Sequence, residues 1–193
     1  MIYIYIMHPT DNGRKIEDKY ENPIDNFLYI FVNKLTPIFH KLGLTPNNIT
    51  FLSFLFTLIS FYFFCKKEYK LAALFWFINY FFDHTDGYMA RKYKMFSKYG
   101  DYYDHLSDLF GGIGLIYLFY RQGRYKEISL IIVLTIINIY HISCQEEIYG
   151  KKNESKTMNL FKLCQDKENI KYTRWFGPGT LNLIIAYLIY ITN

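Results

Sequence analysis

The sequence has few of the residues that build a disulfide or zinc framework. Its 193 residues include three cysteines, Cys65, Cys144 and Cys164, and no two of them have C-x-x-C spacing. Two of the three adjoin apolar blocks of sequence. We therefore interpret all three as reduced packing or surface residues, and expect neither a disulfide scaffold nor a zinc module.

The sequence also lacks a basic segment ahead of its first apolar residues, an internal repeat and a low-complexity tract. Without a basic leading region, the N-terminal stretch MIYIYIM is not expected to be a cleaved signal peptide. The formal net charge is +5, but the basic residues form no single patch with interleaved aromatic residues. This distribution argues against a nucleic-acid-binding protein.

Apolar and aromatic residues dominate the composition of the chain. Hydrophobic residues make up 51% of the chain and aromatic residues 21%, with 20 tyrosines. The apolar residues fall into blocks separated by short basic stretches, whereas a soluble helical protein would alternate apolar and polar residues. Tyrosine suits the membrane–water interface. The composition therefore predicts one integral membrane domain.

The apolar blocks predict an all-α, polytopic membrane helix bundle. A spanning helix needs about 20 mostly apolar residues. We expect five to six transmembrane helices: the apolar blocks supply five, and the family resemblance described below implies a sixth, for which 145–174 is the remaining stretch. The five expected spans are 45–65, 71–91, 102–120, 128–144 and 175–192.

Residues 23–42 predict an amphipathic helix ahead of the first span. Asn22 can cap this helix, and Pro23 suits its first position. A helix with one apolar and one polar face lies in the membrane interface. We therefore divide the chain into an N-terminal tail, 1–22, and a membrane domain, 23–193. The polar face is expected to contain Asp25, Asn26, Asn33, Lys34 and Lys41.

The basic residues predict the orientation of the bundle. The N-terminal segment, the 91–98 loop and the 145–174 stretch together hold sixteen of the 22 lysines and arginines. The positive-inside rule puts the side with these residues in the cytoplasm. The membrane would be an endomembrane if the host is eukaryotic.

A spaced acidic motif lies at the expected cytoplasmic ends of the second and third spans. It reads Asp83-x-x-Asp86-Gly87-x-x-Ala90-Arg91, then eight residues, then Gly100-x-x-x-Asp104-x-x-x-Asp108. Spacings of three and four place side chains on one face of a helix. Because the loop between the two helices is short, we expect them to pack antiparallel, so that the four carboxylates converge.

Four converging carboxylates at membrane depth require cations, because an unpaired one costs several kcal/mol. Oxygen ligands favour Mg²⁺, Mn²⁺ or Ca²⁺ over zinc. The motif therefore predicts a site for two ions about 3.5–4 Å apart, in preference to a solvated acidic loop or a structural ion-pair network. The predicted metal ligands are Asp83, Asp86, Asp104 and Asp108.

Residues beside the carboxylates predict a diphosphate site. Gly87, Ala90 and Gly100 are small, so a ligand or a second helix can come close. The planar fork of Arg91 suits phosphate. Asn47, at the start of the first span, is expected to cap that helix.

The motif resembles the signature of the CDP-alcohol phosphotransferase family. All eight fixed positions match with the family's spacing, and the Thr45-Pro46-Asn47-x-Ile49-Thr50 stretch is similar as well. The resemblance covers Pro23 to about Cys144 well and the C-terminal quarter loosely. It implies transfer of a substituted phosphate from a CDP-linked donor to an alcohol, with release of CMP, in phospholipid biosynthesis. It also implies a homodimer in the lipid bilayer.

The resemblance implies a role for each motif residue. Asp83, Asp86 and Asp104 would hold Mg²⁺ or Mn²⁺, with Asp108 near the second ion. Asp108 would also be the general base on the acceptor hydroxyl. The CDP donor would be bound by Asn47, Asp83, Asp86, Gly87, Ala90, Arg91 and Gly100.

The acceptor stays open at this point. The Gly100-to-His105 stretch resembles that of choline and ethanolamine phosphotransferases, in which the histidine is a candidate base and diacylglycerol is the acceptor. The short chain instead resembles the phosphatidyltransferases, which join CDP-diacylglycerol to inositol, serine or glycerol phosphate. An alternative of another class is a non-enzymatic membrane protein that binds or transports a metal, but it has no need for the small residues Gly87, Ala90 and Gly100.

Overall fold

The computed structural model describes residues 13–97, 99–149, 163–164 and 166–192, and within these ranges the secondary structure is helical throughout. The elements run in the order α1 (Pro23–Lys41), α2 (Pro46–Cys65), α3 (Tyr69–Tyr93), α4 (Gly100–Arg121), α5 (Tyr125–Tyr149), η2 (Lys167–Asn169), α6 (Ile170–Thr173), η3 (Arg174–Phe176) and α7 (Pro178–Tyr190). The expected all-α membrane helix bundle is confirmed.

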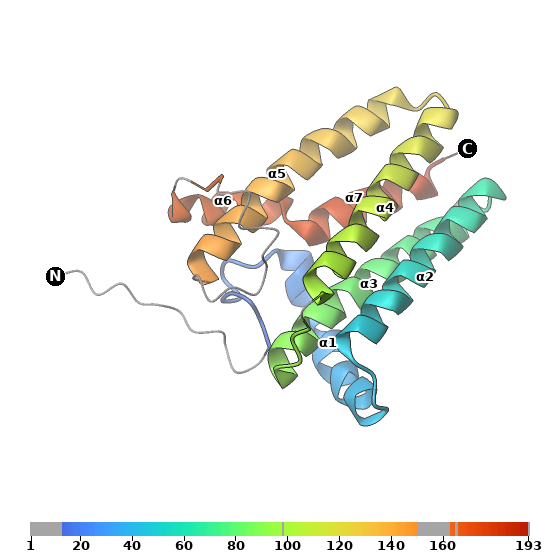
Figure 1. Cartoon of the computed structure of the whole chain (residues 1–193). Helices are drawn as coiled ribbons and strands as arrows, with labels where there is room; N and C mark the ends of the chain where they lie inside the picture. The colour runs from blue at the N-terminus through green and yellow to red at the C-terminus, as the bar shows by residue number, and fades with distance from the viewer. Residues whose placement is uncertain (1–12, 98, 150–162, 165, 193) are drawn as a thin grey trace.

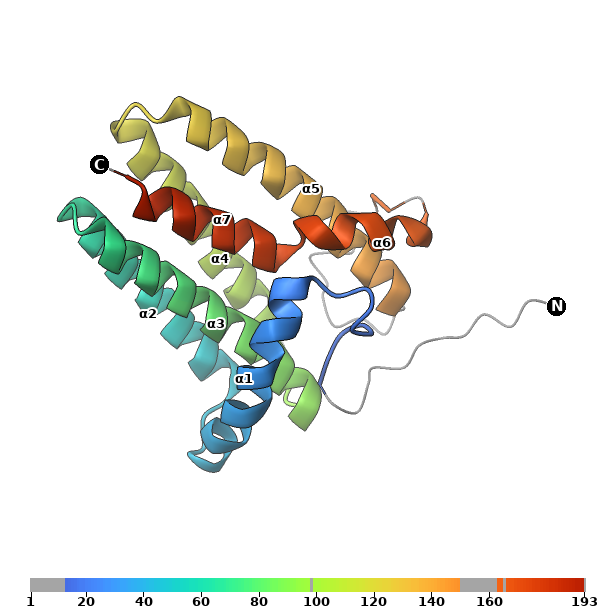
Figure 2. The same cartoon turned by 180° about the vertical axis from the view of Figure 1, so that it is seen from behind.

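The long helices form an up-and-down bundle (Figure 1). The α2–α3 turn, the α4–α5 turn and the end of α7 lie at one end, whereas α1, the α3–α4 junction and α6 lie at the other. Figure 2 shows α1 lying obliquely across α3 at this second end. The residues of the acidic motif therefore lie at the end that also carries α1.

In the part of the chain that the structure describes, two helices are long and apolar enough to cross a membrane by length and composition alone: α2, and α5 from Tyr125 to Glu147. Helices α3 and α4 are as long, but the acidic motif makes one end of each polar. Helix α7 has 13 residues, and 13 residues extend about 20 Å. The sixth span that 145–174 was expected to hold falls largely on 150–162, which lie outside the described residues; the described residues between 163 and 176 form only short helical turns.

The start of α2 corrects one expectation. Thr45, not Asn47, caps this helix: the Thr45 side chain accepts a hydrogen bond from the Asn48 backbone N–H, and the Asn48 side chain accepts one from the Thr45 backbone N–H. This reciprocal pair is a capping box. Asn47 lies inside the first turn, and its side chain does not cap the helix. The expected cap of α1, Asn22, is confirmed.

A row of small polar side chains sets the register between α2 and α3. Ser60 donates to the Ala72 carbonyl at 2.8 Å, and Ser53 lies 2.6 Å from the Asn79 side-chain oxygen. Ser60 follows Ser53 along α2, whereas its partner Ala72 precedes Asn79 along α3. This reversed order is what antiparallel packing requires. Inside a membrane, small polar residues let helices approach closely and join them by hydrogen bonds.

Helix α4 packs against α2 and α5 instead of closely against α3. The two motif helices run antiparallel as expected (Figure 1), but the expectation that they pack on each other is wrong. Gly114 on α4 allows its close approach to α2, because a Cβ there would lie 2.5 Å from the Phe61 ring; a Cβ on Gly111 would only make ordinary contact with Thr57 Cγ2, at 3.5 Å. The carboxylates of α4 therefore face α3 from a helix that does not pack closely against it.

The main apolar core lies in the half of the bundle away from the motif. Trp76 of α3, Phe119 of α4 and Ile185 of α7 are among its buried members. Trp76 Nε1 donates to the Asn182 side chain at 3.1 Å, which satisfies the indole and fixes α7 against α3.

The interpretation of the cysteines is wrong for two of the three. Cys144 and Cys164 form a disulfide with a Cα–Cα distance of 4.9 Å, while Cys65 is free and exposed. The chain returns to the end of α5 after 20 residues. Spacing along the sequence cannot reveal such a return, because only the fold brings the two thiols together.

Candidate metal and nucleotide site

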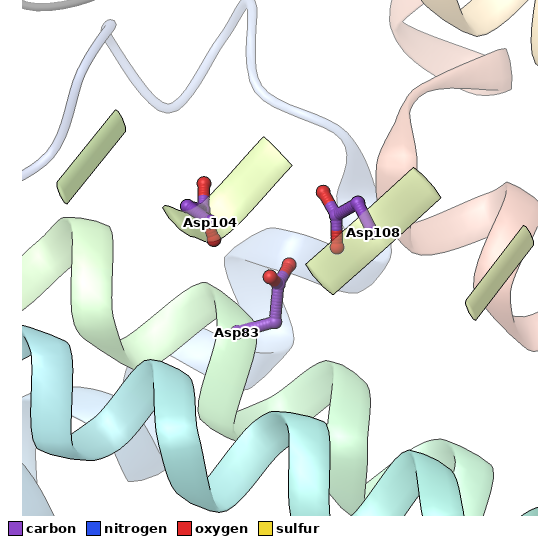
Figure 3. A group of neighbouring side chains, drawn as sticks. All are labelled: Asp83, Asp104 and Asp108. Atoms are coloured by element: carbon purple, nitrogen blue, oxygen red, sulfur yellow. The ribbon is translucent and has the colours of Figure 1, made fainter. Parts of the chain in front are cut away.

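Three aspartates from two helices converge at the α1 end of the bundle. Asp83 of α3 points toward Asp104 and Asp108 of α4, as Figure 3 shows. One carboxylate oxygen from each residue lies within 4.8 Å of the other two. Asp83 and Asp104 are half-buried and Asp108 is exposed, so the group opens to its surroundings on the Asp108 side.

The donor set fits a divalent cation. Three like charges at this separation repel one another unless they share a cation or protons. Asp104 Oδ1 is buried and has no hydrogen-bond partner among the described residues. Oxygen-only coordination of this kind is what Mg²⁺ and Mn²⁺ prefer. Asp83, Asp104 and Asp108 could therefore hold an ion between α3 and α4.

Asp86 lies outside this group of three. It is 6% exposed and accepts a hydrogen bond of 2.6 Å from the Thr50 hydroxyl. On α3 it lies one turn after Asp83. The fourth predicted metal ligand is thus near the site and has one oxygen already engaged.

Gly87 and Arg91 lie together one turn apart on α3. A Cβ on Gly87 would lie 3.1 Å from Arg91 Nη1, so the guanidinium rests over the glycine. Arg91 Nε donates to the Gly13 carbonyl at 2.9 Å, which holds the side chain in place. Ala90 is half-buried beside them. This arrangement leaves little side-chain bulk beside the carboxylates.

The starts of α2 and α4 meet at Gly100. A Cβ on Gly100 would lie 2.6 Å from Ser97 Oγ and 3.2 Å from Asn47 Oδ1. Asn47 and Ser97 lie 3.3 Å apart, within hydrogen-bonding distance. The predicted site residues Asn47 and Gly100 are therefore neighbours, and Ser97 joins them.

The chain matches the family described as CDP-alcohol phosphatidyltransferase over residues 43–192. It belongs to this family. The curated archaetidylinositol phosphate synthase of Pyrococcus horikoshii is 27% identical over 140 residues, which cover 70% of this chain and 69% of the relative.

Membership of the CDP-alcohol phosphatidyltransferase family makes this chain a membrane phosphotransferase of phospholipid synthesis. Members of the family use divalent metal ions, and the cluster of aspartates could bind one. The recognition made from the eight spaced residues is confirmed.

His105 lies among acidic neighbours on its own helix. Its Nδ1 is 3.7 Å from Asp104 Oδ2 and 4.0 Å from Asp101 Oδ1. The ring is half-buried. The histidine is thus adjacent to the three aspartates, of which Asp108 is the exposed one.

Two buried acids near the site were not expected. Asp25 was assigned to the polar face of its helix, but it is 1% exposed, because the start of α7 covers it. Burial, and then the charge of Glu21, raises the pKa of Asp25 to about 8. Burial also raises the pKa of Glu21, against the opposing charges of Arg91, Lys15 and Arg14. No helical periodicity could reveal a face that a distant helix covers.

Two further polar residues near the site were also missed. Thr50 bonds Asp86, and Ser97 lies against Gly100. Thr50 belongs to the stretch that resembles the family's start of the first span, so that stretch was a usable signal. For Ser97, nothing in the spacing distinguishes it from the other residues of the short loop.

Proposed function

We propose that this enzyme transfers a phosphatidyl-type phosphate from a CDP-linked lipid to a polar alcohol and releases CMP. The observation that carries the proposal is the convergence of Asp83, Asp104 and Asp108 at the family's motif positions. The position of Arg91 over Gly87 supports a diphosphate bound beside these carboxylates.

The metal ligands in this proposal are the four motif aspartates, Asp83, Asp86, Asp104 and Asp108, with Mg²⁺ or Mn²⁺ as the ion and two ions in the full site. When bound, the ions neutralise the diphosphate and stabilise the charge that moves to the CMP leaving group. The nucleotide diphosphate is bound by the metal ligands Asp83 and Asp86 together with Asn47, Gly87, Ala90, Arg91 and Gly100.

Asp108 is the proposed general base. Its exposure supports this role, because an acceptor hydroxyl must reach the carboxylate that takes its proton. The acceptor oxygen forms a new bond to the phosphorus that carries the lipid, the bond from that phosphorus to the CMP oxygen breaks, and the acceptor proton passes to Asp108. CMP leaves with the electron pair of the broken bond.

The acceptor in this proposal is a polar alcohol such as inositol, an inositol phosphate, serine or glycerol phosphate. The relative that makes archaetidylinositol phosphate favours this choice over diacylglycerol. The position of His105, beside Asp101 and Asp104, also favours Asp108 over His105 as the base.

The proposed orientation puts the aspartates at the cytoplasmic surface. The basic residues of the two turns at the opposite end are few, namely Lys66, Lys67, Lys70, Arg121, Arg124 and Lys126. An active site at the interface admits a lipid from the bilayer and a nucleotide or alcohol from water. A homodimer is part of the proposal on the strength of the family alone.

Reconstitution with defined substrates tests the proposal. The protein in lipid nanodiscs is incubated either with CDP-diacylglycerol and one of the polar alcohols or with CDP-choline and diacylglycerol. The released CMP and the lipid product are then measured. CMP release with a polar alcohol, abolished by a chelator and restored by Mg²⁺ or Mn²⁺, is the expected result. Product only from diacylglycerol would overturn the acceptor. Metal flux into proteoliposomes that contain the protein, without any CMP release, would instead favour a transport protein.

A further inference from the structure

The inference concerns a contact between two buried side chains on neighbouring helices. Thr50 of α2 and Asp86 of α3 are 36 residues apart in sequence, and the Thr50 hydroxyl lies 2.6 Å from Asp86 Oδ2. Thr50 is 4% exposed and Asp86 is 6% exposed. Because both groups are shielded from water, the hydrogen bond between them has no competing solvent partner.

The hydroxyl proton of Thr50 has two possible acceptors. One is Asp86 Oδ2, and the other is the Pro46 carbonyl in the same helix, at 3.2 Å. A hydroxyl has a single proton, and the shorter bond to a carboxylate is the stronger one. The proton of Thr50 is therefore directed at Asp86.

The register of α2 against α3 makes this contact reproducible. The Ser53–Asn79 and Ser60–Ala72 hydrogen bonds lie on the same side of α2, further along the helix. Together they prevent α2 from sliding along α3 by one turn. Thr50 consequently meets Asp86 and no other residue of the motif.

The hydrogen bond constrains what Asp86 can do. With Oδ2 held by the Thr50 hydroxyl, rotation of the carboxylate is restricted. The Gly87 backbone N–H also bonds this carboxylate, so its orientation is set from both α2 and α3.

We propose that Thr50 is a positioning residue for the metal site, which holds the Asp86 carboxylate in the orientation needed for the cation and the CDP-linked donor. The proposal rests on the proposed function, because it takes Asp86 as a metal ligand. Partners that orient a metal ligand typically change metal affinity by about 10- to 100-fold when they are removed.

Three variants separate this role from packing. Thr50→Val keeps the shape of the side chain and removes the donor, while Thr50→Ser keeps the hydroxyl. Thr57→Val is the matched control, because Thr57 is also a buried threonine of α2, 3% exposed. Among the described residues its hydroxyl bonds the Ser53 carbonyl of its own helix, at 3.4 Å, and no residue of α3.

The readout is Mn²⁺ binding to the purified protein without nucleotide, followed by the loss of the free-ion signal in electron paramagnetic resonance. We expect Thr50→Val to weaken Mn²⁺ binding by about 10- to 100-fold. Thr50→Ser and Thr57→Val should bind Mn²⁺ with an affinity within about threefold of that of the unmodified protein, since both retain the hydrogen bond from residue 50 to Asp86. The Mg²⁺ concentration that gives half-maximal CMP release should shift in the same order.

Equal Mn²⁺ affinity in Thr50→Val and the unmodified protein would overturn the role of Thr50. If Thr50→Val does not fold, Thr50→Ala is the second variant without a donor. Misfolding of both, with Thr57→Val intact, would make Thr50 a structural residue and also overturn the proposal. Absence of Mn²⁺ binding in the unmodified protein is a separate result, which would overturn the proposed metal site itself.

Discussion

The Tyr80 hydroxyl donates a hydrogen bond to the Asp25 carboxylate and so ties α3 to α1, one turn before Asp83. The backbone N–H of Gly179, at the start of α7, bonds the same carboxylate. Asp25 thus joins three helices at the end of the bundle that carries the metal ligands. The position of Asp83 depends on this junction, because Tyr80 and Asp83 belong to neighbouring turns of α3.

The raised pKa of Asp25 predicts a stability that falls as pH rises. The carboxyl has a pKa of about 8 in the folded protein against 3.8 for the ordinary group. Between these values the unfolded chain loses its proton and the folded chain keeps it, so the free energy of unfolding falls by at most about 1.4 kcal/mol per pH unit from about pH 4 to about pH 8.

Thermal unfolding in detergent across this pH range, for the unmodified protein and Asp25→Asn, measures the effect. Asp25→Asn should unfold at a temperature that depends less on pH. Some dependence should remain, because burial also raises the pKa of Glu21. Parallel curves for the two proteins would contradict the assignment to Asp25.

Gly179→Ala should destabilise the junction of α1 and α7. A Cβ at this position would lie 2.8 Å from both Asn22 Oδ1 and Ile24 Cβ, and it would also contact Asp25 Oδ1. Forcing an added methyl into a packed interface costs about 1–3 kcal/mol. Gly112→Ala is the control, since a Cβ there meets nothing within 4 Å. Equal unfolding temperatures of the two variants would refute this packing account.

Asp108→Asn should lower the rate of CMP release by about 10²- to 10⁴-fold, which is the usual contribution of a general base. The amide keeps the size of the side chain, so the protein should remain folded in the membrane. Glu127→Gln, an acidic residue paired with Arg124 near the start of α5, should retain its activity. Normal turnover in Asp108→Asn would exclude it as the base.

His105→Gln should reduce turnover by less than about tenfold, because a residue that only orients Asp104 contributes less than a general base. The ring nitrogen lies 3.7 Å from Asp104 Oδ2, so a modest effect on metal affinity is expected as well. Turnover measured at saturating Mg²⁺ isolates the catalytic step. A loss as large as that of Asp108→Asn would transfer the role of base to His105.

Local patterns in the sequence were enough to predict the long helices and to identify the acidic motif. Blocks of apolar residues bounded by basic ones predict the long helices, because a helix that faces lipid needs a continuous apolar surface. Spacings of three and four put Asp83 with Asp86, and Asp104 with Asp108, on common faces. These are properties of single helices, and neighbours along the chain determine them.

Contacts between helices could not be predicted in the same way. Gly114 lets α4 pack closely on α2, the two motif helices do not pack on each other, and three of the four aspartates form the close group. Asp25 has the spacing of a polar-face residue and is nevertheless buried, since α7 covers it from more than 150 residues away.

The sequence by itself determined the class of fold, the family and the eight residues of the motif, because each depends on residue type and spacing along the chain. The Thr45 cap of α2 could have been read from the sequence, because Thr45-Pro46 has the same local order as the predicted cap Asn22-Pro23. Only the tertiary structure decided that Thr50 holds Asp86 and that Cys144 meets Cys164. The hydrogen bond and the disulfide join segments that are distant in sequence, and residue spacing carries no information about such contacts.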